Sequence, residues 1–135
     1  MMATRIFRVS IPEGLDLAFT FIAACIDSAG LTIKNPETDK ITSWSDEGEQ
    51  VVTASERILP KINSGELTNV QFWSSSSDDM FVSWSRDGCL STFSLHLDGV
   101  DVTQSVAVAS KLIEGLLTKY TSKQIAGDVF AVNFE

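Results

Sequence analysis

The sequence predicts an α+β fold over residues 1–135, taken as a single domain with a mainly antiparallel sheet of about six to seven strands. Three consecutive apolar runs, Leu67–Trp73, Met80–Ser85 and Cys89–Leu97, are separated by turn sequences and alternate as strands do. A helical pattern over Asp101–Tyr120 follows them directly. The predicted order is β-α-β-β-α-β-β-β-α-β, which suits one antiparallel sheet with helices packed on it.

The first two elements differ in the period of their apolar residues. Thr4–Ile11 alternates and is followed by Pro12 and Gly14, so we predict a strand there. Leu15–Ala29 does not alternate, is rich in helix formers and precedes Gly30, which suits a helix C-terminus. This helix is apolar nearly all round. We therefore expect either a second helix or another subunit to pack beside it.

The next segment predicts two short strands and a second helix. Leu31–Lys34 and Lys40–Ser45 flank the turn sequence NPETD and are interpreted as strands. From Asp46 the apolar residues recur at three- and four-residue steps as far as Ile62, which indicates a helix that Pro60 kinks or ends.

The meander is built around a predicted turn at Asp87-Gly88, a strong two-residue hairpin signal. This register places Met80, Val82 and Trp84 on the core side with Phe93, Leu95 and Leu97. It places Phe81, Ser83 and Ser85 on the opposite side with Leu90, Thr92, Ser94 and His96. The preceding sequence SSSSDD is then a hairpin loop, because a linker between domains would not preserve strand pairing.

The last helix and strand have clear boundaries. Asp101 is a good N-cap, and Gln104 three positions later completes a capping-box pattern. The apolar stripe expected to face the core consists of Val102, Val106, Ala109, Ile113, Leu116 and Tyr120. Phe130, Val132 and Phe134 then alternate as a final strand.

Composition and charge limit the possible partners. The net charge is −8, and residues 46–101 hold ten acidic and three basic residues, so that this part alone has a charge of −7. Such a field repels nucleic acid and anionic lipid and attracts basic proteins. The longest apolar stretch, Leu17–Ile26, is about half the length of a membrane span. Two isolated cysteines, Cys25 and Cys89, suit a reducing compartment, and we expect a cytoplasmic protein.

No motif predicts a catalytic residue, a metal site or a cofactor. The serines lack a nucleophile elbow, and the glycines are scattered singly rather than grouped in a phosphate loop. The acidic pairs lack calcium-loop spacing. His96, the only histidine, lies on the hydroxyl-rich sheet face with Ser94 and Thr92, which leaves a small-ligand site or an enzyme there as an alternative.

The acidic middle of the chain also contains aromatic residues predicted to be outside the main core. Trp73 alternates out of phase with Val70 and Phe72, so Trp73 and Phe81 are expected on the face opposite the core, unless the second helix covers them. Aromatic rings among polar residues are typical of protein-binding hot spots. The predicted partner-binding residues are Asp46, Glu47, Glu49, Gln71, Trp73, Asp78, Asp79, Phe81 and Asp87.

These observations favour a non-enzymatic acidic domain that binds a basic protein. Small acidic α+β proteins of this class include the bacterial immunity proteins, which neutralise toxins by direct binding, and many of those toxins are basic nucleases. The leading hypothesis is therefore an immunity-type inhibitor of a basic toxin. The alternatives are a secretion chaperone that binds effectors as a homodimer through Leu15–Ala29, a small-ligand protein or enzyme around His96, and a structural homo-oligomer.

Overall fold

The computed structural model describes residues 4–121 and 127–135. Its elements, in chain order, are β1 (Arg5–Ile11), α1 (Leu15–Ser28), β2 (Ile41–Trp44), β3 (Gln50–Thr53), a 3-10 turn (Ser55–Arg57), α2 (Ile58–Ser64), β4 (Asn69–Trp73), β5 (Asp79–Asp87), β6 (Leu90–His96), α3 (Val102–Lys119) and β7 (Phe130–Phe134). The predicted α+β class is confirmed, and the strand and helix order is close to the predicted one.

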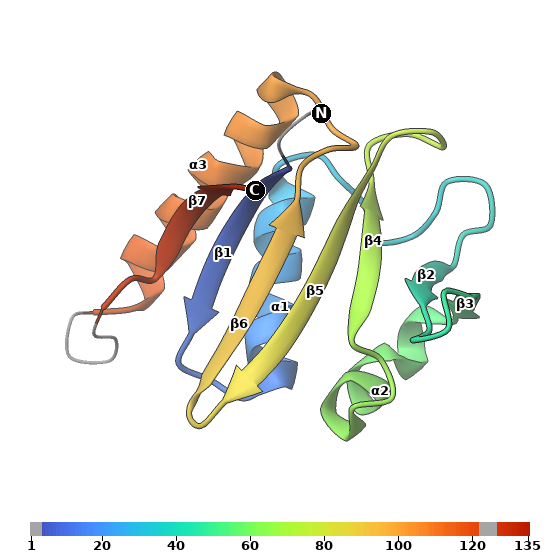
Figure 1. Cartoon of the computed structure of the whole chain (residues 1–135), viewed down its shortest axis with the longest axis horizontal. Coiled ribbons are helices and arrows are strands. Elements are labelled where there is room, and N and C mark those ends of the chain that lie inside the picture. The colour runs from blue at the N-terminus through green and yellow to red at the C-terminus, as the bar shows by residue number, and fades with distance from the viewer. Residues whose placement is uncertain (1–3, 122–126) are drawn as a thin grey trace.

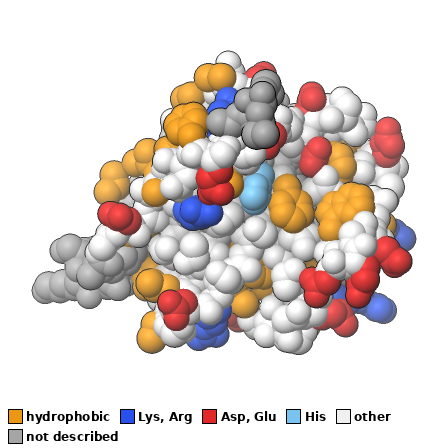
Figure 2. All heavy atoms as spheres, viewed as in Figure 1, with side chains coloured by type: hydrophobic (Ala, Val, Ile, Leu, Met, Phe, Trp, Pro, Cys, Tyr) orange, Lys and Arg blue, Asp and Glu red, His pale blue; other side chains and the backbone are white. Residues whose placement is uncertain are grey.

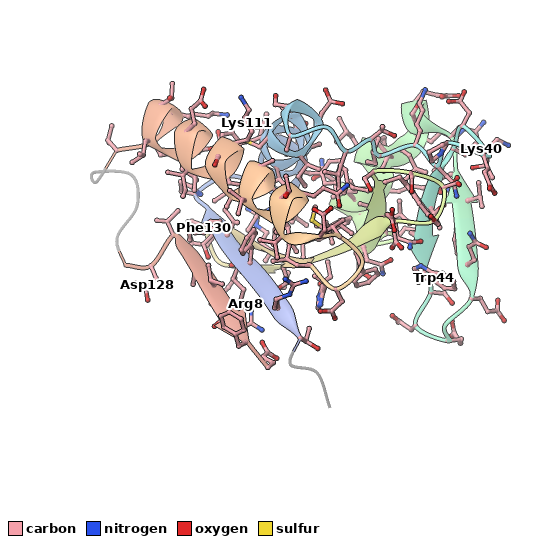
Figure 3. All side chains as sticks on the ribbon, turned by 90° about the horizontal axis from the view of Figure 1, so that it is seen from above. Arg8, Lys40, Trp44, Lys111, Asp128 and Phe130 are labelled. Carbon is pink, nitrogen blue, oxygen red and sulfur yellow. The ribbon has the colours of Figure 1, made fainter. Side chains whose placement is uncertain are left out.

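Five strands form one antiparallel sheet in the order β4-β5-β6-β1-β7, and β2 and β3 form a separate two-stranded hairpin. Both α1 and α3 pack on one face of the large sheet (Figures 1 and 3). The hairpin β2–β3 stands beside β4 at one edge, while β7 forms the other edge. The opposite face of the sheet carries no helix in the part of the chain that the structure describes.

The core lies between the sheet and the two long helices, because the strands alternate and present one apolar face to them. Its completely buried members include Val9, Ile11, Ile22, Ile26, Val82, Phe93, Leu95, Val108 and Leu112. The helix α3 packs beside α1 on the same face of the sheet. Gly115 permits this close packing, since an added Cβ would lie 3.0 Å from Cys25 Sγ and from Phe21 Cζ. Of the two partners expected for α1, a second helix is therefore the one observed.

The prediction for residues 46–57 is wrong. The helix expected from Asp46 begins only at Ile58, and Gln50–Thr53 instead pairs with β2 as the strand β3. The turn between them contains Gly48 at φ +82°, and the backbone N–H of Glu49 donates to Ser45 Oγ. Three consecutive β-branched residues, Val51, Val52 and Thr53, favour the extended strand over the helix.

Two smaller corrections concern the neighbours of this hairpin. Leu31–Lys34 forms only isolated bridges, Thr32 with Trp73 and Lys34 with Ile41, rather than a strand. Pro60 does not end a helix, because it lies in the first turn of α2, where a missing backbone N–H removes no intrahelical hydrogen bond.

The turn of the β5–β6 hairpin lies one residue later than predicted. Asp87 pairs with Leu90, so Gly88 and Cys89 are the central residues, and Gly88 has the positive φ of +61° that a type II′ turn needs at its first position. Moving the turn by one residue shifts the cross-strand partners by two. Since side chains alternate with a period of two, the predicted faces of both strands are confirmed.

The helix α3 has the predicted N-terminus but buries a different stripe. Asp101 and Gln104 form the capping box. The buried residues of the helix are Ser105, Val108, Leu112 and Leu116, with Tyr120 buried just beyond it. Three residues of the predicted stripe are exposed: Val102, Val106 and Ile113. The helix therefore has two neighbouring apolar stripes, and its periodicity alone did not show which of them faces the core.

Candidate functional site: the open face of the sheet

The sheet face that α1 and α3 leave uncovered is named here the open face. Its side chains include Ile6, Arg8 and Ser10 from β1, Thr92, Ser94 and His96 from β6, Asp79, Phe81, Ser83 and Ser85 from β5, Asn69, Gln71 and Trp73 from β4, and Ala131 and Asn133 from β7. Figure 2 views this face, with the histidine near its centre, uncharged polar surface around it, and hydrophobic and then acidic groups toward the β2–β3 side. The predicted hydroxyl-rich character is confirmed by the register, which places Ser10, Ser83, Ser85, Thr92 and Ser94 on this face.

Trp44 stands at the edge of the open face, where the hairpin β2–β3 meets β4. Its indole Nε1 donates a hydrogen bond to Gln71 Oε1 at 2.9 Å. Its backbone N–H donates to Asn69 Oδ1 at 2.7 Å, and its carbonyl accepts from Asn69 Nδ2 at 2.9 Å. Figure 3 shows Trp44 and Arg8 on the same side of the sheet, away from the helices. The ring is 37% exposed and is held in one orientation from both ends.

Phe81 and His96 form the aromatic centre of the open face. They are direct cross-strand partners, and their ring centroids are 5.4 Å apart. A hollow of about 270 Å³ lies next to them and is lined by Asp79, Phe81, His96, Asp98 and Gly99. Both residues are half-buried, so part of each remains accessible to solvent.

Trp73 lies on the predicted face but is buried, with 8% of its surface exposed. No helix is involved. The backbone of Thr32 pairs with that of Trp73 along the outer edge of β4, so the segment before β2 runs alongside this residue. Gln71 is buried as well, and its Nε2 donates to Asp79 Oδ2. Neither residue is free to contact a partner, which contradicts the expectation for Trp73 as an exposed ring.

The structure separates the predicted acidic residues into three places. Asp46, Glu47 and Glu49 are exposed on the β2–β3 turn, and Asp78 and Asp79 lie where the β4–β5 loop meets β5. Asp87 is at the far end of β5, about 27 Å from Asp79 at ~3.4 Å per residue. Asp87 is therefore not part of the same surface, whereas the other five acids lie at the β2–β3 and β4–β5 turns, on the side of the sheet that carries Trp44.

The loop SSSSDD is ordered by its own hydrogen bonds. The Oγ of Ser75 accepts from the backbone N–H of Ser77 at 3.3 Å and from that of Asp78 at 3.1 Å. It also donates to Asp78 Oδ2 at 3.2 Å. The serines thus hold the carboxylate of Asp78 at the tip of the loop, exposed to solvent.

The β1 side of the open face carries one arginine, which is paired with a carboxylate. Arg8 lies on β1, and its Nη2 is 3.0 Å from Glu135 Oε2. Arg5, on the same strand, donates from Nη2 to the carbonyl of Leu97 at 3.3 Å. Arg5 faces the opposite side of the sheet, because it is one residue out of phase with Ile6 and Arg8 on β1. On the β1 side of the open face the charges of Arg8 and Glu135 are therefore paired, whereas no described Lys or Arg forms an ion pair with the five acids of the β2–β3 and β4–β5 turns.

Other kinds of site find little support in the described residues. They contain no group of three or more His, Cys, Asp and Glu side chains placed to hold a metal ion. The helices at 15–28, 58–64 and 102–119 also lack the length and apolarity needed to cross a membrane. On the hydroxyl-rich part of the face, Thr92 and Ser10 share a hydrogen bond of 3.1 Å between their hydroxyl oxygens, so Thr92 already has a structural partner.

Comparison with known proteins adds no assignment. No family model matches the chain, and no curated protein or solved structure is significantly similar to it.

Trp44 is not among the predicted partner-binding residues, although it is the most exposed tryptophan of the face. The signal was present, since Trp44 ends a predicted strand only two residues before the acidic turn that begins at Asp46. The residue that contacts Trp44 could not be predicted from the sequence. Gln71, which orients the indole, is 27 residues further along the chain.

Proposed function

We propose that this chain is a non-enzymatic binding domain that docks a basic protein on the acidic half of its open face. The observation that supports the proposal most directly is the pair of accessible rings, Trp44 and Phe81, on a helix-free face between two acidic turns. Within this class, an immunity-type inhibitor that neutralises a basic bacterial toxin, such as a nuclease, remains the leading hypothesis. A cytoplasmic location belongs to the same hypothesis and agrees with the unpaired Cys25 and Cys89.

The rings and the charges have separate roles in this proposal. Trp44 is oriented before binding by its hydrogen bond to Gln71, so docking on it costs little side-chain entropy. Aromatic residues of this kind dominate the affinity of many interfaces. The exposed acids at Asp46, Glu47 and Asp78 mainly accelerate the encounter with a positively charged surface.

The proposal is tested by capturing basic proteins from the source cell on the immobilised chain and measuring the association kinetics of the captured protein. Reversing two docking charges in the Glu47→Lys/Asp78→Lys variant should lower the association rate constant about tenfold at low salt, and less at high salt. The matched control is Asp27→Lys/Glu114→Lys. It makes the same change in net charge at exposed residues of α1 and α3, on the other side of the sheet.

The ring is tested separately with Trp44→Ala, which should raise the dissociation rate by about fivefold or more, corresponding to at least ~1 kcal/mol of binding free energy. Trp44→Phe keeps an aromatic ring and should lose less. Equal kinetics for the docking and control charge variants, or capture of acidic proteins alone, would contradict the proposal.

The second candidate function is a small-ligand site, favoured by the hollow beside His96. Two carboxylates, Asp79 and Asp98, line this hollow together with the imidazole, which suits a small cationic ligand. Chemical-shift changes in a titration with small amines would be confined to these residues if the candidate is correct. They would be absent in His96→Ala and Asp98→Asn variants.

The homodimeric chaperone is less well supported by the geometry. Its proposed contact, the helix Leu15–Ala29, packs against both the sheet and α3, and Leu17 is the large apolar side chain that this helix exposes, at 57%.

A further inference from the structure

A second surface, at the opposite edge of the sheet from the hairpin β2–β3, contains six of the eleven large hydrophobic side chains that are exposed in the described part of the chain. They lie on α3 and β7 and are named here the α3–β7 patch: Val102, Val106, Ile113, Leu117, Val132 and Phe134. Leu117 and Phe134 are 79% and 71% exposed. Between the two elements runs an apolar groove of about 280 Å³, which Leu116 and Phe130 help to line.

The patch is as large as the largest apolar patches of ordinary monomers, which are often functional. From their exposed fractions, the six side chains present on the order of 600 Å² of apolar area, at the upper end of the largest patch of a typical monomer. A surface of this kind indicates a partner that covers it.

The strand β7 is the last strand of the sheet, and no other described strand pairs with its outer edge. Thr4 and Glu135 exchange both of their backbone hydrogen bonds, and Ala131 and Asn133 continue this alternation toward β1. The backbone N–H and C=O groups of Phe130, Val132 and Phe134 therefore point away from the sheet. The strand has no proline, glycine, lysine or other charged residue of the kind that usually protects an edge.

We propose that the α3–β7 patch is the interface of a homodimer, in which β7 pairs with β7 of a second copy about a two-fold axis at Val132. Antiparallel pairing of a strand with itself is a two-fold operation, and it would continue the antiparallel sheet to ten strands. The two α3 helices would then lie next to each other on one face, with their exposed apolar stripes in contact.

The sequence of β7 suits this axis. It is Phe-Ala-Val-Asn-Phe, which has the same apolar spacing in both directions. With Val132 opposite its own copy, Phe130 lies opposite Phe134 of the second copy, and all three outward-facing residues of each strand form hydrogen-bonded pairs. Aromatic cross-strand pairs are among the more stabilising ones.

Area and charge favour a second copy as the occupant. The apolar side chains alone provide most of the roughly 800 Å² that each partner of a standard interface buries. Glu135 is the acidic residue next to the paired segment, and Arg8 compensates its charge at 3.0 Å. Because β4 and the acidic turns are at the opposite edge of the sheet, this inference does not depend on the proposed function.

Sedimentation velocity tests the proposal directly. The apparent molecular mass from sedimentation should be about twice the chain mass of 14.7 kDa. Protein concentrations of about 1–100 μM suit an interface of standard size. Leu117→Lys and Val132→Lys should each weaken dimerisation at least tenfold, because each places an ammonium group in the apolar interface. The control Leu17→Lys makes the same change at an exposed leucine of α1 and should leave the dimer intact. Circular dichroism of each variant verifies that it is folded.

A cysteine placed on the axis tests the register. In a Cys89→Ser background, Val132→Cys should form a disulfide-linked dimer under mild oxidation, since the Cα atoms of a hydrogen-bonded pair are about 5.5 Å apart. Asn133→Cys should not, because Asn133 faces Ala131 of the second copy. A monomer at ~100 μM would overturn the proposal. So would a dimer that persists in both patch variants, or one that only Leu17→Lys disrupts.

Discussion

Gly99 is the position where one added methyl group should have the largest local effect. It lies in the loop between β6 and α3, and an added Cβ would be 2.1 Å from the carbonyl oxygen of Asp79 and 3.2 Å from its carbonyl carbon. Both atoms belong to the backbone, so no side-chain rotation can relieve the contact. Asp79 is also the first residue of β5, where it pairs with Trp73 in the sheet.

The cost of Gly99→Ala follows from this geometry. A non-bonded carbon and oxygen need about 1 Å more than the available separation, so either the loop or the end of β5 must move. Overpacking of this kind destabilises a fold by about 1–3 kcal/mol, and we expect the upper half of that range because the opposing atoms are fixed in the sheet. For a chain of 135 residues this corresponds to a fall in Tm of roughly 6–12 °C.

The assay is urea unfolding followed by tryptophan fluorescence and by circular dichroism. Gly115→Ala is the matched control. Its Cβ would meet only side-chain atoms of Cys25 and Phe21, at 3.0 Å, and alanine improves the helix propensity of α3 by about 1 kcal/mol, so the net change should lie within about 1 kcal/mol of zero. If Gly99→Ala unfolds at the wild-type urea concentration, the loop does not lie against Asp79, and the hollow beside His96 has a different shape.

Two further predictions concern titration and thiol chemistry. Burial raises the pKa of Tyr120, and its pKa is raised further by the hydrogen bond that its hydroxyl donates to Glu13 and by the charge of that carboxylate. Tyr120 is the single tyrosine of the chain, so its ionisation can be followed by the tyrosinate absorbance. This absorbance should not develop at the usual pH of about 10. Because the folded-state pKa is higher than the unfolded-state pKa, the stabilisation by Tyr120 is complete below about pH 10 and is lost as the pH rises further. The Tyr120→Phe variant should not show this loss of stability. A normal ionisation curve in the folded protein would contradict this reasoning. Burial, followed by the charge of Glu114, raises the pKa of the Cys25 thiol, while Cys89 is exposed on a turn. A thiol reagent should therefore modify one cysteine in the native protein and both in urea, and rapid modification of Cys25 in the native protein would show that α1 and α3 separate readily.

The regular elements of this protein could be predicted because their periods are local. The alternation of Met80, Val82 and Trp84 correctly assigned the faces of β5, even though the turn at Gly88 lies one residue later than expected. The capping box at Asp101 and Gln104 was equally readable, since its geometry spans only four residues. The helix predicted for residues 46–57 was wrong because an apolar spacing that suits a helix is also compatible with a short strand followed by a turn.

The candidate site was predicted only in part. Its acidic residues are on turns, where charge and exposure can be inferred from composition. Which tryptophan is accessible could not be inferred, because Trp73 is flanked by a bridge to Thr32, and Trp44 is oriented by Gln71.

The sequence by itself thus determined the class of fold, the alternating faces of the sheet and the sign of its surface charge, since each depends on neighbouring residues or on simple counts. Tertiary structure alone decided which of the two apolar stripes of α3 is buried and which ring remains in contact with water. Burial depends on contacts between segments far apart in the chain, and local periodicity carries no information about which segments meet.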